Sequence, residues 1–229
     1  MVAGPLMVAM GLYTPLHAAA VALFLAAPWM FDARGWTVAA GLTLLYVFPP
    51  LAARLVLTAC DSQATTVPVG SAAFLRWWAL AQLQLVFNRL PALEELLRLV
   101  PSLYSAWLRL WGARVGRFVY WAPGVLVTDR SLLEVGDRVV VGVSTRIVAH
   151  VIIGQPDGRR ALLMAPVVIG SGAIVGGFSV LGPGARILEG EMPPALTVLS
   201  PFWTWSGGRR RFAPGNGATA PSVAVGDGT

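Results

Sequence analysis

Histidine is the residue type best suited to proton transfer near neutral pH, and this chain has only two, His17 and His150. The pKa of an unperturbed imidazole is about 6.5, so a neutral ring is available at pH 7. His17 lies within a long apolar run, whereas His150 lies in a more polar part of the chain. His150 is therefore the candidate catalytic histidine, and a loop histidine that only caps a backbone group is the alternative, which the residue type alone favours.

Other chemistry is limited by composition. Cys60 is the single cysteine, so no internal disulfide can form, and a lone thiol after an apolar run is typical of a small buried residue. Cysteine and histidine do not cluster at metal-ligand spacing, so we expect no metal site and no tightly bound cofactor.

The basic residues are all arginines, seventeen in number, and the formal net charge is +6. This charge favours acidic partners, either anionic lipid headgroups or a phosphate-bearing substrate, and we expect no nucleic acid among them. A GC-rich genome is the plain explanation for the missing lysines.

Residues 1–60 are expected to form a transmembrane helical hairpin. Residues 5–31 and 35–53 carry no formal charge, and about 20 apolar residues suffice to span a bilayer. Pro49 and Pro50 should kink or end the second helix. The alternative is a pair of buried core helices. Within a span His17 could be functional, but a neighbour such as Tyr13 could equally satisfy it.

Arginines near the second span predict the orientation. Arg54, Arg76 and Arg89 follow it, whereas only Arg34 lies between the spans, so the C-terminal part should be cytoplasmic. This places the chain in the inner (cytoplasmic) membrane of a bacterium.

Residues 61–112 are expected to form amphipathic interfacial helices, interrupted by Pro91 and Pro101 and stopped by Gly112. Arginines and tryptophans alternate here: Arg76, Arg89, Arg98 and Arg109 with Trp77, Trp78, Trp107 and Trp111. This mixture suits the lipid headgroup layer. An ordinary set of core-facing helices is the alternative.

Residues 113–205 carry a six-residue repeat. The chain reads VGRFVY, WAPGVL, VTDRSL, an insert LE, VGDRVV and VGVSTR, and then, after a break, IGSGAI, VGGFSV, LGPGAR and ILEGEM. Such a period predicts a parallel β-helix of about three coils, with the first and fifth positions inward and a small residue after the first at a tight corner. The fold class is therefore α + β, and residues 206–229 should be a basic and then disordered tail.

Over residues 115 to about 201 this pattern resembles the hexapeptide-repeat acyltransferases, including the ending ILEGEMPPALTVLSP. The resemblance implies a left-handed β-helix, an acyl-CoA donor and a homotrimer. The layout of a hairpin, the stretch FNRLPALEELLRLVPSLYSAWLRLWG and a β-helix is also similar to the C-terminal units of membrane-bound polylysine synthetases, which join amino-acyl groups delivered as thioesters.

By position, at the start of the break in residues 144–166, the resemblance implies that His150 is the catalytic general base. Asp129 and Glu134 are both candidates to orient it, and Ser144 and Thr145 are candidates to bind an oxyanion.

For the donor, the resemblance implies contacts of Gly177 with pantetheine and of Arg186 and Arg209 with the CoA phosphates. The run Arg209, Arg210 and Arg211 could instead mark a membrane-proximal or solvated end, and Arg159 and Arg160 could hold an anionic acceptor.

We therefore expect a membrane-anchored acyltransferase that moves an acyl group from acyl-CoA to a hydroxyl or amine. An amide-forming unit supplied by a carrier-bound aminoacyl thioester, and a non-catalytic β-helix scaffold at the membrane, are the alternatives.

Overall fold

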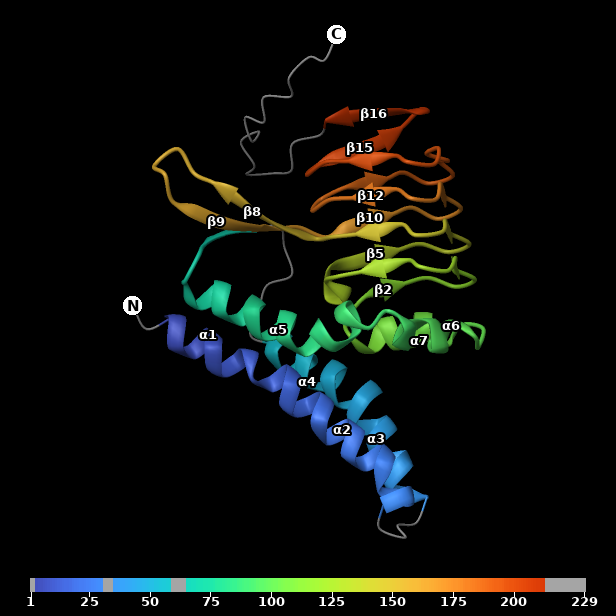
Figure 1. The fold of residues 1–229 in the computed structure, drawn as a ribbon. Coiled ribbons are helices and arrows are strands. Elements are labelled where there is room, and N and C mark those ends of the chain that lie inside the picture. Colours follow the sequence, from blue (N-terminus) through green and yellow to red (C-terminus); the bar gives the residue numbers. More distant parts are fainter. Residues whose placement is uncertain (1–2, 31–34, 59–64, 213–229) are drawn as a thin grey trace.

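The computed structural model describes residues 3–30, 35–58 and 65–212, so Arg34, Cys60 and the tail after Phe212 lie outside the described residues. Two apolar helical arms form one end of the molecule, a layer of three helices follows, and a stack of short parallel strands rises from that layer (Figure 1).

The apolar end consists of α1 (Ala3–Gly11), α2 (Tyr13–Met30), α3 (Trp36–Tyr46) and α4 (Phe48–Leu57). Proline cannot continue a helix from its interior but fits the first turn, so Pro49 and Pro50 start α4 after a break at Val47. Two segments, Gly4–Trp29 and Trp36–Leu57, are long and apolar enough to cross a membrane, and only 11% and 28% of their apolar windows are buried.

The helical layer consists of α5 (Ala72–Arg89), α6 (Ala92–Arg98) and α7 (Leu103–Leu110). Three helices separated at Pro91 and Pro101 were expected, and Gly112 ends the last one with φ +107°. The expectation that the tryptophans lie among lipid headgroups is wrong for Trp77, Trp107 and Trp111, which are buried. Trp107 of α7 and Trp111 directly after it pack against Phe87 of α5, and Trp77 packs against Val67 and Leu162 of two strands, because these contacts offer more apolar surface than a headgroup layer does.

Two arginines of this region bind backbone carbonyls. Arg54 donates to the carbonyls of Arg109 (2.8 Å) and Leu110 (3.1 Å), which lie at the C-terminal end of α7. Arg109, expected at lipid phosphates, instead donates to the carbonyls of Val115 (2.8 Å) and Gly116 (2.6 Å). These bonds connect the apolar helices to α7 and α7 to the first coil of the β-helix.

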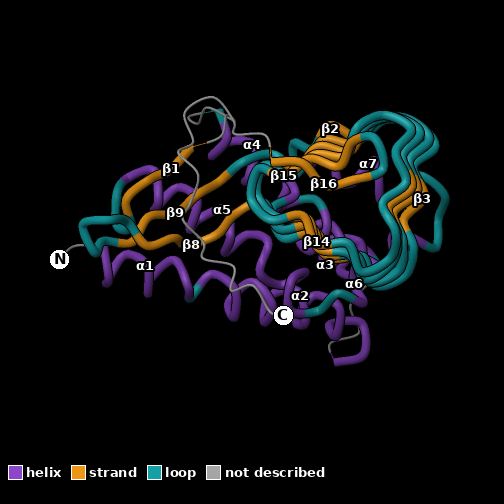
Figure 2. Tube along the Cα trace, turned by 90° about the horizontal axis from the view of Figure 1, so that it is seen from above, coloured by secondary structure: helices purple, strands orange, loops and turns teal. Residues whose placement is uncertain are grey.

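The β-helix has three faces, each a ladder of stacked strands. The first face contains β2 (Arg114–Val115), β5 (Leu133–Val135), β10 (Val167–Ile169), β13 (Arg186–Ile187) and β15 (Trp203–Ser206), all parallel, closed by antiparallel β16 (Arg209–Phe212). The second contains β3 (Tyr120–Trp121), β6 (Val140–Val141) and β11 (Ile174–Val175). The third contains β4 (Leu126–Val127), β7 (Arg146–Ile147), β12 (Val180–Leu181) and β14 (Val198–Leu199). Figure 2 looks along this stack.

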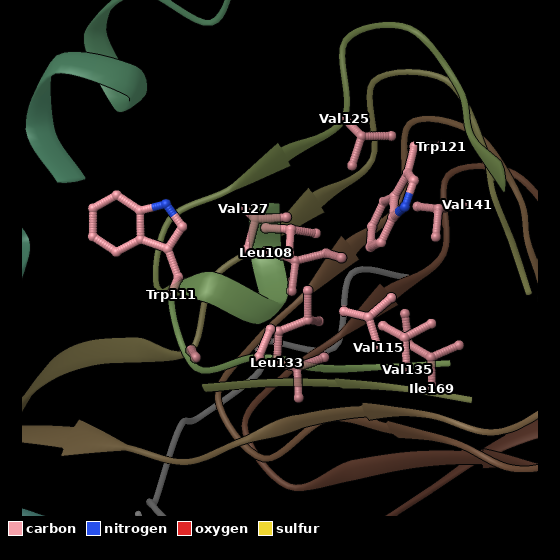
Figure 3. Close-up of a cluster of buried hydrophobic side chains, with 14 of the residues drawn as sticks. Leu108, Trp111, Val115, Trp121, Val125, Val127, Leu133, Val135, Val141 and Ile169 are labelled. Atoms are coloured by element: carbon pink, nitrogen blue, oxygen red, sulfur yellow. The ribbon is translucent and has the colours of Figure 1, made fainter. Parts of the chain in front are cut away.

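The hexad positions point as the repeat predicts. First-position side chains such as Val141, Ile169 and Leu181 are at most 1% exposed, and so are the fifth-position side chains Thr145 and Ala185. In the first coils Val115, Val135 and Ile169 stack on one another, and Leu108 of α7 closes the open end (Figure 3). The handedness of the coils stays a prediction.

The small residue after the first position is needed for space rather than for backbone conformation. A Cβ added at Gly142 or Gly170 would lie 2.5 Å from backbone nitrogens of the next coil. The turn residue with positive φ is the fourth of every hexad except VTDRSL, where Arg130 begins a 3₁₀ helix. Gly172 (70°) and Gly184 (72°) adopt this conformation, and even Phe118 and Phe178 do. The predicted corner was therefore two residues too early.

We expect Gly176→Ala to destabilise the β-helix by about 1–3 kcal/mol, because its Cβ would lie 2.2 Å from the Ala195 nitrogen and 2.3 Å from the Pro194 carbonyl carbon. The measurement is thermal unfolding in detergent. Gly154→Ala is the control, since nothing lies within 4 Å of a Cβ there. Equal melting temperatures for the two variants would contradict this account of the glycines.

The break in the repeat is a β-hairpin rather than a loop. Strands β8 (His150–Gly154) and β9 (Arg160–Met164) pair antiparallel, and β1 (Thr65–Pro68), which was expected to be helical, joins the outer edge of β9. Figure 1 shows this sheet projecting from the β-helix above α5. Val67 and Leu162 of the sheet pack with Phe74 and Trp77 of α5.

The first ladder of the β-helix continues past residue 205, the expected end of the domain. Glu191 accepts hydrogen bonds from the backbone nitrogens of Gly207 (2.6 Å) and Gly208 (3.2 Å), and so holds the turn that leads into β16. Arg209, Arg210 and Arg211 lie on β16 and are exposed.

Candidate active site

His150 and Asp129 form a hydrogen-bonded dyad. The distance between His150 Nδ1 and Asp129 Oδ2 is 2.7 Å, and the two side chains are 29% and 5% exposed. An ionised carboxylate can only accept hydrogen bonds, so Nδ1 of His150 must donate. In a neutral imidazole this leaves the lone pair on Nε2, and the ring can accept a proton there.

The strand register explains why these two residues meet. Val127 of β4 lies opposite Ile147 of β7 in the third ladder. The chain continues in parallel from both, so Asp129 lies beside Ala149, and the Ala149 nitrogen donates to Asp129 Oδ2 at 3.2 Å. One residue later the chain leaves the coil as β8, and His150 is the first residue of that strand.

Asp129 accepts hydrogen bonds on both carboxylate oxygens. Oδ2 accepts from Thr128 Oγ1 at 2.7 Å as well as from His150 and Ala149. Oδ1 accepts from the indole nitrogen of Trp77 at 3.4 Å. Burial raises the pKa of Asp129, but the hydrogen bond and the charge of His150 lower it, and so do the hydrogen bonds from Thr128 and Trp77. The net effect brings the pKa below 3.8. The carboxylate is therefore ionised at neutral pH.

The indole of Trp77 also covers the imidazole. The ring centroids of Trp77 and His150 are 4.8 Å apart at an interplanar angle of 58°. Trp77 comes from α5, so one wall of the site belongs to the helical layer and the other to the β-helix.

A buried ionic network lies directly after Asp129. Arg130, completely buried, forms an ion pair with Glu94 of α6 and donates to Gln84 Oε1 (3.2 Å) and Asn88 Oδ1 (3.0 Å) of α5. Glu94 also accepts from Tyr104 Oη of α7 at 2.6 Å. The short 3₁₀ helix Arg130–Leu132 is thereby joined to all three helices of the layer. This network holds the backbone beside Asp129 in place.

The other predicted partners of His150 lie elsewhere. Glu134, the second candidate to orient the ring, pairs with Arg114 at 2.8 Å on the first face of the β-helix. Thr145 points into the β-helix, where its hydroxyl lies 3.5 Å from the Gly176 carbonyl. Ser144 occupies a turn with φ 54°, at the corner before β7. Neither hydroxyl has a hydrogen bond to the dyad among the described residues.

The predicted donor contacts are also separate from His150 within one chain. Gly177 lies at the corner between β11 and β12, whereas His150 follows β7 at the next corner of the triangle. Arg186 is exposed on β13 and Arg209 on β16, at the end of the first ladder. No hydrogen bond or ion pair in the described part of the chain joins any of the three to His150.

The arginine run on β16 lies far from the apolar helices. Five strand spacings separate β16 from β2, which contacts α7, and at about 4.8 Å each this is roughly 24 Å. Figure 1 shows β16 at the end opposite the apolar helices. Arg159 and Arg160 lie at the exposed tip of the hairpin, where Arg159 is 3.6 Å from Asp157.

Acid sensitivity should follow from Asp129. Because its pKa in the folded state lies below 3.8, its stabilising contribution is complete above that pH and is lost as the pH falls through the folded-state pKa. We expect Asp129→Asn to be less stable than wild type by about 1–3 kcal/mol at pH 7, with the difference shrinking below pH 4. The measurement is thermal unfolding between pH 7 and pH 3.

Asp157→Asn is the control for this experiment, because Asp157 has a 58% exposed side chain at the hairpin tip. It should unfold like wild type at every pH. A pH-independent difference between wild type and Asp129→Asn would contradict the assigned ionisation.

Two site residues had no signal of their own in the sequence. Trp77 was grouped with residues expected at the membrane interface, and Thr128 was not singled out. Thr128 could have been found once Asp129 was chosen, because it is the preceding residue in the hexad VTDRSL. The described residues contain no group of three His, Cys, Asp or Glu side chains that could hold a metal ion.

The chain is a parallel β-helix that carries, beside a helical layer, a dyad of a buried aspartate and a partly exposed histidine. No family model and no curated protein matches the chain. Among solved structures the chain is similar to a hexapeptide-repeat acetyltransferase of Vibrio cholerae O1 biovar eltor in complex with acetyl coenzyme A, at 17% identity over 58% of this chain and 88% of that one, with a TM-score of 0.40.

It is also similar to a maltose O-acetyltransferase of Clostridium difficile 630, at 16% identity over 56% of this chain and 86% of that one, with a TM-score of 0.33. Soybean serine acetyltransferase matches at 18% identity over 87% of this chain and 70% of that one, with a TM-score of 0.27. These likenesses are weak, and the assignment of the fold rests on the strand register of the chain itself.

Proposed function

We propose that this protein is a membrane-anchored acyltransferase that moves an acyl group from an acyl-CoA thioester to a hydroxyl or amine. The observation that carries the proposal is the Asp129–His150 dyad at the edge of a hexapeptide-repeat β-helix, with 2.7 Å between Nδ1 and the carboxylate. An oriented, partly exposed imidazole is the group that general-base catalysis requires.

In the proposed reaction, Nε2 of His150 accepts the proton of the acceptor hydroxyl or amine while that oxygen or nitrogen attacks the thioester carbonyl carbon. The carbonyl oxygen becomes an oxyanion. When the carbonyl re-forms, the carbon–sulfur bond breaks, and the imidazolium returns the proton to the CoA sulfur. Asp129 stabilises the imidazolium through Nδ1 and keeps the tautomer correct.

For the donor, we propose that pantetheine passes Gly177 and that Arg186 and Arg209 meet the CoA phosphates. Gly177 and His150 occupy different corners of one chain, so this arrangement uses the Gly177 corner of one copy and the His150 of another. A homotrimer supplies such a pairing. Phe178, beside Gly177, is 57% exposed in the single chain. A large apolar side chain that is covered by a second copy in the trimer would be exposed in this way.

We further propose that α1–α4 are the membrane anchor and that the β-helix faces the cytoplasm. The largely exposed apolar windows of Gly4–Trp29 and Trp36–Leu57 support an anchor. Residues 1–60 would be the anchor, 61–112 the layer at its surface and 113–205 the catalytic domain. The site lies directly above this layer, so the acceptor would be a membrane lipid or another apolar molecule.

The test is thiol release by the detergent-purified protein from acetyl-CoA and longer acyl-CoAs, with amines, alcohols and a membrane lipid extract as acceptors. Release that requires an added acceptor is expected. Absence of release with every acyl-CoA, from a folded protein, would contradict the proposed donor. Turnover of a carrier-bound aminoacyl thioester instead would identify an amide-forming unit, and inactivity with both donors would leave a scaffold.

A further inference from the structure

We propose that Trp77 is a positioning residue that holds the Asp129–His150 dyad in its reactive arrangement. This inference rests on the proposed function, because it assigns a task to Trp77 within the same site. It also makes α5, a helix outside the hexapeptide repeat, a part of the catalytic machinery.

The first observation is how the hydrogen bonds divide between the two carboxylate oxygens. Among bonds between described residues, three donors bind Oδ2 of Asp129, from Thr128, Ala149 and His150. The indole N–H of Trp77 is the donor on Oδ1, at 3.4 Å. Trp77 therefore opposes rotation of the carboxylate, which would take Oδ2 out of line with the imidazole.

The second observation is the ring contact with His150. The indole lies against the imidazole at 4.8 Å between centroids, so a single side chain touches both members of the dyad. Trp77 is itself only 9% exposed, and its ring centroid lies 5.5 Å from that of Phe74 and 6.1 Å from that of Trp78. A rigid, buried ring limits the directions in which the imidazole can turn.

The third observation is where α5 sits. Besides α6 and β1, it packs against α1, α2 and α4, which belong to the apolar helices that we propose to lie in the membrane. Next to Trp77, Trp78 donates from its indole nitrogen to the Met7 carbonyl of α1 at 3.3 Å. The helix that positions the dyad is thus the one that packs on the anchor.

The kinetic test uses Trp77→Phe, which keeps an apolar ring and removes the N–H donor. We expect kcat for acyl transfer to fall about tenfold, the effect of losing one hydrogen bond to a charged group.

Trp78→Phe is the matched control. It makes the same chemical change at the adjacent residue, where the lost bond goes to a backbone carbonyl of α1 and not to the dyad. It should leave kcat unchanged. Melting temperatures of both variants separate an effect on the dyad from loss of folding.

The second test does not depend on turnover. The chain contains two histidines, so ¹⁵N-histidine labelling yields two imidazole rings, and His150→Ala identifies which signals belong to His150. In wild type we expect one tautomer for His150, with the proton on Nδ1. In Trp77→Phe the Nδ1 and Nε2 shifts should move toward each other as the second tautomer becomes populated, whereas Trp78→Phe should match wild type.

The two arms distinguish failure of this inference from failure of the proposed function. An inactive wild type whose His150 signals still respond to Trp77→Phe would overturn the acyltransferase and support the positioning role. An active wild type with unchanged imidazole signals in Trp77→Phe would overturn the positioning role, whatever the kinetics of that variant, and leave the acyltransferase in place.

Discussion

His150→Ala should lower kcat for acyl transfer by about 10³-fold without a comparable loss of stability. General-base catalysis contributes roughly 10²–10⁴-fold in enzymes, and no second histidine lies outside the apolar helices. Among the described residues the 29% exposed ring makes one side-chain hydrogen bond, to Asp129, and one ring contact, with Trp77, so its removal should cost less stability than the loss of a fully buried side chain. The measurement is steady-state thiol release with saturating acceptor, beside thermal unfolding of the same preparations.

The control for this variant is His17→Gln, which removes the other imidazole. His17 stacks on Tyr13 at 5.1 Å and on Phe48 at 6.1 Å and has no described connection to the dyad. Its replacement should leave kcat within about twofold of wild type at a temperature where the variant is folded. Thiol release that survives in His150→Ala at the wild-type rate would remove His150 from the mechanism.

Arg130→Met should lower the free energy of unfolding by about 3–5 kcal/mol, the effect of breaking a buried ion pair from one side. The substitution removes one of the positive charges that surround Glu94, whose side chain is buried (1% exposed). It also removes the N–H groups that donate to Gln84 and Asn88. Activity should fall as well, because Asp129 is the preceding residue. The measurement is thermal unfolding, in which a chain of this size should show a decrease of about 10 °C.

Arg114→Met provides the matched comparison. Arg114 is also paired with a glutamate, but its side chain is 78% exposed, and a surface ion pair contributes at most about 1 kcal/mol. The two variants remove the same charge from the same domain and differ in burial. If they unfold at the same temperature, the network around Glu94 does not hold the helices to the β-helix.

Glu94→Leu combined with Arg130→Met tests the cause of the loss. In Arg130→Met the buried Glu94 keeps only Arg98 as an ion-pair partner among the described residues, and in the double variant Arg98 keeps its pair with Glu95. Removing the under-compensated carboxylate should therefore recover part of the stability lost in Arg130→Met. Recovery would assign the loss to the Glu94 carboxylate that Arg130 no longer compensates. A further loss would assign it to the polar contacts with α5.

The sequence by itself determined the features that depend on local periodicity. A hexad places its first and fifth side chains inward whatever lies around it, so the β-helix, its buried positions and the excursion before Ile169 could be predicted. The three helices between Ser71 and Gly112 follow from prolines and a glycine that end helices in any context. His150 could be singled out because few other residues offer the same chemistry.

The tertiary structure alone decided which residues surround His150. Asp129 and Glu134 were equal candidates in the sequence. The register of Val127 against Ile147 brings Asp129 to the imidazole, whereas the register of β2 against β5 places Glu134 opposite Arg114. Tryptophan and arginine at helical spacing fit a lipid interface and a protein core alike. The packing of α5 on the hairpin places Trp77 in the protein core, because the side chain finds there an apolar environment and a carboxylate that accepts from its N–H.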